Sequence, residues 1–303
     1  MALAGKPPPD KATRLKMMLY GAAGCGKTTA AIQLPNPYIV DSEKGTDRYG
    51  SLIRSVNGAV VQTSSYDAVI KEIKALATEK HPYKSLIIDP ITPIYNDTLD
   101  KAEDELGASH GRHFGKAGKL FRRMYSLITN LDMNVCVICH GKAEYAPGKE
   151  MLKIGETFDG PKSWDHMFDL VLELTKKGNK SAVRKAFVKK TRIEAFPDGD
   201  IFDWSYKELM RRMGQDAIEG ESRPIEYVSK DNLDRFRTLV RESRITAQEA
   251  TEMQDQCGVT DWEDAPAEYI DRFIVQLQDR VNRLKLAKPE AIRLSTDSQV
   301  PEF

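Results

Sequence analysis

The sequence predicts an α/β protein: a mostly parallel β-sheet covered by helices on both faces, followed by a small helical module. Short apolar runs alternate with helical patterns up to about residue 214, and only helical patterns follow. The runs are apolar almost throughout, which is typical of parallel strands buried on both faces. The 303 residues are 41% hydrophobic and 30% charged, a composition that excludes a disordered chain.

The expected elements follow one another in a regular order. Residues 1–13, which contain three consecutive prolines, predict a disordered arm. Apolar runs predict strands at 15–21, 38–41, 58–62, 85–89 and 134–140. Helical spacing predicts helices from the turn after Gly21 to Pro35 and at 66–80, 91–106 and 119–131, with a basic, glycine-rich loop at 107–118. Residues 143–162 predict hairpins or mobile loops, and 169–174 with 182–190 predict a hairpin, turning at Gly178 and Asn179, that extends the sheet.

The composition changes twice along the chain. We expect a core at 14–214, a linker and helical module at 215–287, and a disordered tail at 288–303. No run approaches roughly 18 apolar residues, and the first residues lack an apolar secretory segment. We therefore expect neither a membrane span nor an export signal, and a cytoplasmic location.

The four cysteines are too few and too scattered for a disulfide framework, so we expect reduced thiols. Cys136 and Cys139 form a C-x-x-C pattern within an apolar run that predicts a buried strand. Side chains three apart on a strand point to opposite faces, so the two thiols are not expected to share a metal or a disulfide. Core packing is the preferred interpretation.

The formal net charge is zero, with 45 basic and 45 acidic residues, which by itself argues against a nucleic-acid partner. The distribution argues otherwise, because 112–123 carries five Lys or Arg and 176–192 carries eight, both without an acid. The alternatives are a solvated helix face and a solvated hairpin. Residues 245–271 hold eight acids and no Lys or Arg. That acidic module is expected to dock on a partner, to cover the basic loops as a DNA mimic, or to serve only stability or oligomerisation.

A glycine-rich motif between an apolar strand and a helix carries the clearest chemistry. Residues 21–28, GAAGCGKT, match G-x-x-x-x-G-K-[ST]. In such a P-loop, backbone N–H groups and the positive end of the helix dipole bind nucleotide phosphates. The residues expected to bind nucleotide are Gly21, Ala22, Ala23, Gly24, Cys25, Gly26, Lys27, Thr28 and Thr29.

Two residues are expected to hold Mg²⁺. The Thr28 hydroxyl is the P-loop's metal ligand, and Lys27 neutralises the β- and γ-phosphate oxygens. Asp89 ends the apolar run of 85–89, where a second-strand acid would hold the metal through water. The alternative for Asp89 is a helix N-cap.

Hydrolysis also needs a group that orients or deprotonates water. Glu43 follows the strand after the P-loop helix and is the preferred candidate, with Asp41 as the competing acid. His140, at the end of the apolar run of 134–140, is expected to sense the γ-phosphate, unless it is purely structural. The sequence has no N-K-x-D guanine motif and no L-S-G-G-Q, so a GTPase or a transporter ATPase is not expected, and ATP is the favoured nucleotide.

The position of Glu43, rather than an acid beside Asp89, is typical of RecA-type ATPases and not of the AAA+ class. Residues 13–213 resemble this group, and 105–115 and 142–160 occupy the places of RecA's two DNA-binding loops. The segment 187–196 resembles the strand whose two basic residues, matched by Lys190 and Arg192, reach a neighbour's γ-phosphate. The whole chain looks most like the compact phage nucleotide-binding proteins of the RecA-like single-strand annealing group, which implies the host cytoplasm.

The resemblance implies a RecA-type P-loop core that binds single-stranded DNA as a ring or filament of identical subunits. The residues expected to contact DNA are Arg112, His113, Lys116, Lys119, Lys142, Lys149 and Lys153, with Phe114 or Tyr145 stacking on bases. His140 departs from the family, because it stands near a position where RecA carries Gln. The helical module is a candidate site for a single-strand binding or replication protein.

The first functional hypothesis is a Mg²⁺-dependent ATPase that binds single-stranded DNA and promotes annealing or recombination. Glu43, Lys27, Lys190 and Arg192 are its expected catalytic residues. The second is a nucleotide-gated binding module with negligible turnover that recruits partners through its C-terminal helices. A third, a small-molecule P-loop kinase, lacks an arginine-rich lid.

Overall fold

A computed structural model describes residues 14–107, 111–146, 152–161, 164–177, 183–220 and 222–294. The chain divides into two units, Met1–Pro224 and Ile225–Phe303, and each is described by itself. The expected disordered arm at 1–13, the turn at Gly178 and Asn179, and residues 295–303 of the expected tail lie outside the described residues. No helix in the described part of the chain is both long and apolar enough to cross a bilayer.

The first unit is built on an eight-stranded sheet. Its strands, in spatial order, are β10 (Ile201–Asp203), β9 (Val183–Thr191), β8 (Leu170–Lys177), β1 (Lys16–Tyr20), β5 (Asn134–Ile138), β4 (Ser85–Asp89), β2 (Pro37–Asp41) and β3 (Ala59–Gln62). All neighbouring pairs from β8 to β3 are parallel, and β9 is antiparallel to both of its neighbours. The predicted mostly parallel sheet and the β8–β9 hairpin are therefore confirmed.

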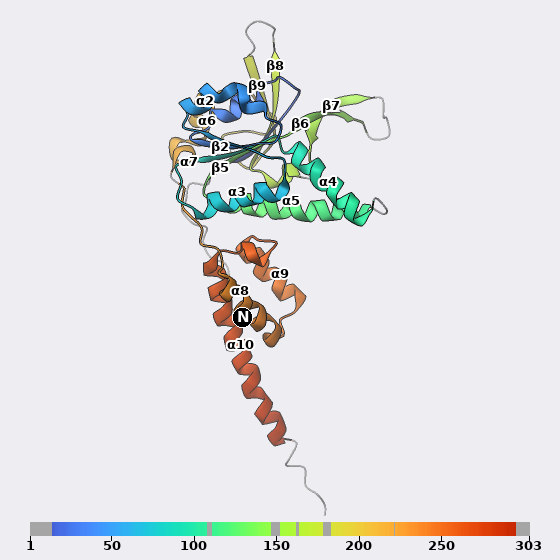
Figure 1. Cartoon of the computed structure of the whole chain (residues 1–303), viewed down its shortest axis with the longest axis vertical. Coiled ribbons are helices and arrows are strands. Elements are labelled where there is room, and N and C mark those ends of the chain that lie inside the picture. The colour runs from blue at the N-terminus through green and yellow to red at the C-terminus, as the bar shows by residue number, and fades with distance from the viewer. Residues whose placement is uncertain are drawn as a thin grey trace, which may run out of the picture. The chain divides into compact units, whose positions relative to one another are not determined.

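Helices cover the sheet on both faces, with α1, α2 and α6 on one side and α3, α4 and α5 on the other (Figure 1). Their bounds are α1 (Lys27–Ile32), α2 (Gly50–Ser55), α3 (Tyr66–Thr78), α4 (Thr92–Leu106), α5 (Arg112–Asn130), α6 (Tyr206–Met213) and α7 (Gln215–Glu219). Five-residue strands buried on both faces explain the nearly uniform apolar runs, since every residue of β1, β4 and β5 is buried.

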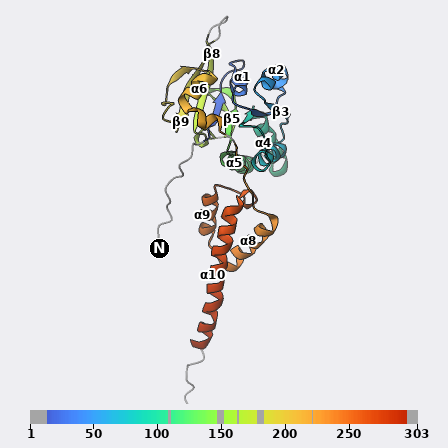
Figure 2. The ribbon, with the colours of Figure 1, turned by 90° about the vertical axis from the view of Figure 1, so that its left-hand side faces the viewer.

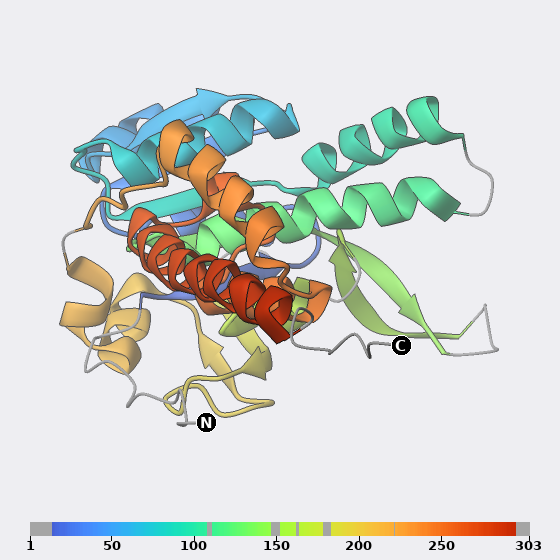
Figure 3. The same ribbon diagram turned by 90° about the horizontal axis from the view of Figure 1, so that it is seen from below.

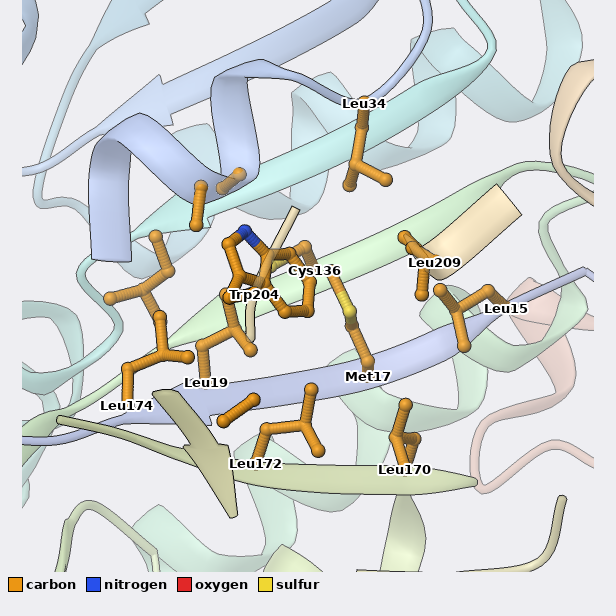
Figure 4. Close-up of a cluster of buried hydrophobic side chains, with 14 of the residues drawn as sticks. Leu15, Met17, Leu19, Leu34, Cys136, Leu170, Leu172, Leu174, Trp204 and Leu209 are labelled. Carbon is orange, nitrogen blue, oxygen red and sulfur yellow. The ribbon is translucent and has the colours of Figure 1, made fainter. Parts of the chain in front are cut away.

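Alternate residues of the central strands form the core against α1 and α6. Leu170, Leu172 and Leu174 of β8 point to the same face as Met17 and Leu19 of β1, as expected for a two-residue side-chain period (Figure 4). All of them are fully buried. Cys136 lies in the same cluster, and Cys25, Cys139 and Cys257 are buried as well, so the cysteines pack in the interior as expected.

The opposite face is closed by aromatic side chains. Phe121 of α5 lies with its ring centroid 5.1 Å from Tyr95 of α4 and 5.3 Å from Trp164, and Trp164 lies 5.6 Å from Phe168. These edge-to-face pairs fix α4 and α5 on the sheet.

One element begins earlier than the sequence predicts. Residues 107–118 were expected to form a loop, but α5 begins at Arg112, directly after Gly111, which caps it in a left-handed conformation. His113, Ala117 and Phe121 recur at helical spacing and are buried. Burial of this face outweighs the low helix propensity of the two glycines in the first turns.

A two-stranded hairpin stands apart from the main sheet. It comprises β6 (His140–Tyr145) and β7 (Lys153–Asp159), which pair antiparallel from His140 with Asp159 outward. The hairpin overlaps 143–162, where hairpins or loops were expected, but it begins at His140, which was expected to end the preceding strand. Its far end and the adjoining ends of α4 and α5 project to the same side of the sheet (Figures 1 and 3).

The second unit has its own apolar core. Three helices form it, α8 (Lys230–Ser243), α9 (Ala247–Cys257) and α10 (Ala267–Leu294), as the helical spacing predicts (Figure 2). Phe236 of α8 and Phe273 of α10 are buried at its centre. Thr246 and Glu249 form a capping box at the start of α9, and Glu249 also pairs with Arg280 at 2.6 Å. Helix α10 continues past residue 288, where the disordered tail was expected to begin, and ends at Leu294.

The boundary between the units also differs from the expected one at 214. Ile218 of α7 is fully buried in the core of the first unit, and its carbonyl accepts a 2.7 Å hydrogen bond from the Asn134 side chain. The polar composition after 214 conceals this anchor, so the first unit extends to Pro224.

Candidate nucleotide-binding site

The P-loop occupies the turn between β1 and α1, at the carboxyl edge of the parallel strands. Gly24 and Gly26 adopt φ angles of +74° and +95°, which side-chain-bearing residues rarely adopt. Gly26 precedes the first residue of α1, so the N–H groups of the first helical turn face the loop. A Cβ atom at Gly24 would meet open space, so the positive φ angle, and not a lack of room, is what favours glycine at this position. This turn has the shape of a phosphate-binding cradle.

Lys27 folds back over the loop. Its ammonium donates hydrogen bonds to the carbonyl oxygens of Gly21 at 2.7 Å and Ala22 at 3.0 Å. The positive charge is thereby held at the mouth of the loop, where a bound phosphate would replace these neutral acceptors with charged ones.

Thr28 and Asp89 form the candidate metal site. Asp89 ends β4 and is 7% exposed, and the Thr28 side chain lies near enough to its carboxylate to favour the charged form. Burial raises the pKa of Asp89 to about 6, against the opposing effects of Thr28 and Lys27. A hydroxyl and a carboxylate are hard oxygen ligands of the kind that Mg²⁺ binds together with substrate phosphates, so these residues fit the metal.

Asp41, the competing acid for water activation, is already engaged in holding the backbone. Its carboxylate accepts hydrogen bonds from the backbone N–H groups of Glu43 at 3.1 Å, Gly45 at 3.1 Å and Thr46 at 2.9 Å, and from the Thr46 hydroxyl at 2.5 Å. Burial acts to raise the pKa of Asp41, but these hydrogen bonds outweigh it and lower the pKa below its usual value. Asp41 therefore shapes the turn that presents Glu43.

Glu43, in the turn after β2, and His140, the first residue of β6, face each other. The Glu43 Oε1 and His140 Nε2 atoms lie 3.2 Å apart, and the two side chains are 45% and 44% exposed. The Ser42 hydroxyl donates to the Pro90 carbonyl at 2.7 Å, which ties this turn to the end of β4 that carries Asp89. The expected nucleotide-site residues therefore converge at one edge of the sheet.

Gly141, which the sequence analysis did not single out, joins the hairpin to the P-loop. A Cβ atom at this position would lie 2.8 Å from the carbonyl carbon of Gly21 and 2.9 Å from its oxygen. The hairpin thus begins in direct contact with the P-loop backbone. No sequence signal marks this contact, because it joins segments 120 residues apart.

Lys190 and Arg192 lie at the opposite edge of the sheet from the P-loop. Leu170, at the start of β8, pairs with Thr191 at the end of β9, so the P-loop edge lies at the other end of both strands. Lys190 bonds the Phe168 carbonyl, and Arg192 bonds the His166 carbonyl at 2.7 Å. Burial, followed by the charge of Arg192, lowers the pKa of Lys190. Neither side chain reaches the nucleotide site of its own chain.

The residues expected to contact DNA fall on two elements. Arg112 and Lys119 are exposed on α5, where Lys116 pairs with Glu105. Lys142 pairs with Asp159 at 3.2 Å and Lys153 with Glu156 at 3.5 Å on the β6–β7 hairpin. Lys149 lies outside the described residues.

His113 departs from the expectation. Its ring is 8% exposed and lies 4.1 Å from the Phe114 ring between centroids, so it does not contact DNA in this conformation. Phe114 and Tyr145 are more than half exposed, which leaves both rings available for stacking.

Fold and site together define a P-loop NTPase core with a mostly parallel α/β sheet and C-terminal helices. The chain belongs to the AAA domain family, whose pattern matches residues 13–197. The solved structure of a KaiC-like protein from the hyperthermophilic archaeon Pyrococcus horikoshii OT3 is similar over 62% of this chain and 84% of that chain, with a TM-score of 0.40 and 16% identity. No curated protein gives a significant match.

Proposed function

We propose that the chain is a Mg²⁺-dependent ATPase in which Glu43 activates the attacking water. The convergence of Lys27, Thr28, Asp89 and Glu43 at one edge of the sheet is the observation that carries this proposal. Mg²⁺, when bound, neutralises negative charge on the phosphate oxygens. Thr28 and Asp89 would hold it, and Lys27 would balance the charge of the β- and γ-phosphates.

The Glu43 carboxylate is the proton acceptor for water in this scheme. It is exposed, lies next to the Asp89 strand, and is free of the backbone contacts that occupy Asp41. His140 faces Glu43 and sits directly before Gly141, which touches the P-loop. A change at the phosphates is therefore transmitted through Glu43 and His140 to the start of the β6–β7 hairpin.

We further propose that the ATPase binds single-stranded DNA and promotes annealing or recombination. The β6–β7 hairpin and the adjoining ends of α4 and α5 project in the same direction, which supports this proposal (Figure 3). These elements carry two exposed aromatic and two exposed basic side chains, those of Phe114, Tyr145, Arg112 and Lys119. Basic side chains bind the flexible phosphate backbone of single-stranded DNA, and its bases stack on exposed aromatic rings.

Action as an oligomer follows from the placement of Lys190 and Arg192. Since these residues cannot reach their own P-loop, a role at the γ-phosphate requires a neighbouring subunit that presents the opposite sheet edge. Subunits stacked head to tail in a ring or filament meet this condition. The resemblance to the phage single-strand annealing group and the host cytoplasm belongs to the same proposal.

The second candidate is a nucleotide-gated module with negligible turnover that recruits a single-strand binding or replication protein. The C-terminal unit has its own apolar core, and this favours the second candidate, because such a unit can offer a partner protein a surface separate from the nucleotide site. The two candidates predict different responses to DNA.

The test is ATP hydrolysis with and without single-stranded DNA, at low and moderate salt. Stimulation that weakens steeply with salt supports the DNA-dependent ATPase. Bound nucleotide without stimulation supports the gated module. Nucleotide affinity that is equal in the wild type and in Lys27→Ala contradicts both.

A further inference from the structure

Arg184 lies beside the P-loop and has no role in the site described above. It is near the start of β9, opposite Lys176 of β8, at the edge of the sheet where β1 enters the P-loop. A Cβ atom at Gly26 would overlap the Arg184 guanidinium, lying 2.7 Å from Cδ and 2.9 Å from Cζ. Glycine at position 26 thus leaves the space that this half-buried side chain occupies.

The other basic side chains of β9, and that of Arg192 just after it, all have partners. Lys185 pairs with Asp203, Lys189 with Glu173 at 3.5 Å, Lys190 bonds the Phe168 carbonyl and Arg192 the His166 carbonyl. The guanidinium of Arg184 has no hydrogen bond or ion pair within the segments that the structure describes. Its backbone is fixed, because the Arg184 carbonyl accepts a 2.8 Å hydrogen bond from the Trp204 N–H.

The strand order determines the side from which Arg184 approaches. Asp89 at the end of β4 and Glu43 after β2 lie to one side of β1, and β8 and β9 lie to the other. A nucleotide with its terminal phosphate and metal at Asp89 and Glu43 would present the phosphates nearer its ribose towards β9. ATP and ADP have these inner phosphates in common.

We propose that Arg184 binds a phosphate oxygen that ATP and ADP share, on the nucleotide held by its own P-loop. The inference rests on the proposed function. A guanidinium offers five N–H donors in a rigid fork that matches phosphate geometry. A partly buried guanidinium without protein acceptors retains this capacity in full, and Arg184 needs no neighbouring subunit to reach the site.

The experiment compares Kd values for ATP and for ADP in the full-length wild type, Arg184→Gln, Arg184→Lys and Lys185→Gln. Arg184→Gln is expected to weaken both nucleotides about tenfold and to similar extents, because a charge-assisted hydrogen bond is lost in both complexes. Arg184→Lys, which keeps the charge, is expected to recover part of the loss. Lys185→Gln, one position along and paired with Asp203, is the matched control with unchanged affinities.

Unchanged affinity of Arg184→Gln for both nucleotides overturns the inference, and so does a loss confined to ATP, which would place the residue at the γ-phosphate. Lys27→Ala separates this inference from the proposed function. Lost binding in Lys27→Ala with normal binding in Arg184→Gln contradicts the inference alone, whereas normal binding in Lys27→Ala contradicts the nucleotide site itself. Melting temperatures of the wild type and the variants, measured without nucleotide, are expected to be equal, which shows that all of these proteins are folded.

Discussion

Asp89 shows how burial sets the chemistry of a single carboxyl group. It is 7% exposed, and its pKa is raised to about 6 by burial, whereas Asp41 on the adjacent strand has a lowered pKa. The two groups differ because burial is the largest effect on the pKa of Asp89, whereas three backbone N–H groups and the Thr46 hydroxyl donate to Asp41 and outweigh its burial. Asp41 is therefore engaged by the backbone, whereas the Asp89 carboxylate is left available for the proposed metal.

The raised pKa predicts a pH dependence of Mg²⁺-supported ATP binding. The folded pKa lies above the usual 3.8, so the carboxylate is lost as the pH falls through 6. A protonated carboxyl is a poor metal ligand, and affinity is expected to fall by about tenfold for each pH unit below 6.

Asp89→Asn is the control. The variant has no carboxyl group to titrate at this position, so any pH dependence that it retains comes from the nucleotide and the other groups. Titration calorimetry from pH 7 to pH 5 measures the ratio of the two affinities. A ratio that stays constant over this range contradicts a role of Asp89 in metal binding.

Sequence reasoning was strongest for residues whose function depends on local spacing. Lys27 and Thr28 follow from the motif, and Asp89 from its place at a strand end, and the structure brings them to one edge. The engagement of Asp41 depends on N–H groups presented by a turn. Spacing does not encode such a contact, nor the packing of Arg184 on Gly26 from a strand 158 residues away.

At the scale of elements, the β6–β7 hairpin is joined to the P-loop by one close approach. Gly141 lies against Gly21, and Thr92 at the start of α4 donates a 2.6 Å hydrogen bond to the Asp159 carbonyl at the end of β7. Both strands of the hairpin are thus fixed at their base, next to the nucleotide site.

Gly141→Ala is predicted to disturb this base. The added methyl would lie within 3 Å of the Gly21 backbone, which cannot move without changing the phosphate cradle. We expect a loss of about 1–3 kcal/mol in the free energy of unfolding, together with weaker nucleotide binding.

Gly155→Ala on β7 is the matched control. Its Cβ atom would meet only the end of the Glu144 side chain, at 3.6 Å. Denaturant unfolding and nucleotide titration of both variants measure the difference. Equal behaviour of the two variants would show that the contact at Gly141 does not matter.

Helix α5 shows where element boundaries escape sequence reasoning. Its last turns follow the pattern of apolar residues, but its first turns contain Gly115 and Gly118, which favour a loop by propensity. Burial of His113 and Ala117 against the rest of the core extends the helix to Arg112. Tertiary packing decided this boundary, and a single sequence does not reveal it.

At the scale of the whole molecule, the chain consists of two units with separate cores. The first ends after α7, whose Ile218 is buried and whose backbone satisfies Asn134. The second is closed by Phe236, Phe273 and their neighbours. The sequence predicts both units, but the polar residues after 214 suggest a linker where the structure has an anchoring helix.

This organisation predicts different outcomes for two truncations. A chain ending at Pro224 is expected to keep nucleotide affinity within about twofold of the full chain, since both core and site are intact. A chain ending at Gly214 loses the buried Ile218 side chain and the shorter of the two hydrogen bonds that the Asn134 amide donates, so we expect it to be destabilised by about 3 kcal/mol or more. Thermal unfolding measures both, and equal stability of the two fragments would contradict the assigned boundary.

The central claim is that Glu43 activates water at a P-loop site, and single-turnover ATP hydrolysis by Glu43→Gln tests it most directly. Glu103→Gln, on the exposed surface of α4, is the control. We predict ATP affinity within about threefold of the wild type and a hydrolysis rate lowered by about a hundredfold or more, as expected when a general base is removed. Hydrolysis at the wild-type rate in Glu43→Gln would contradict the account.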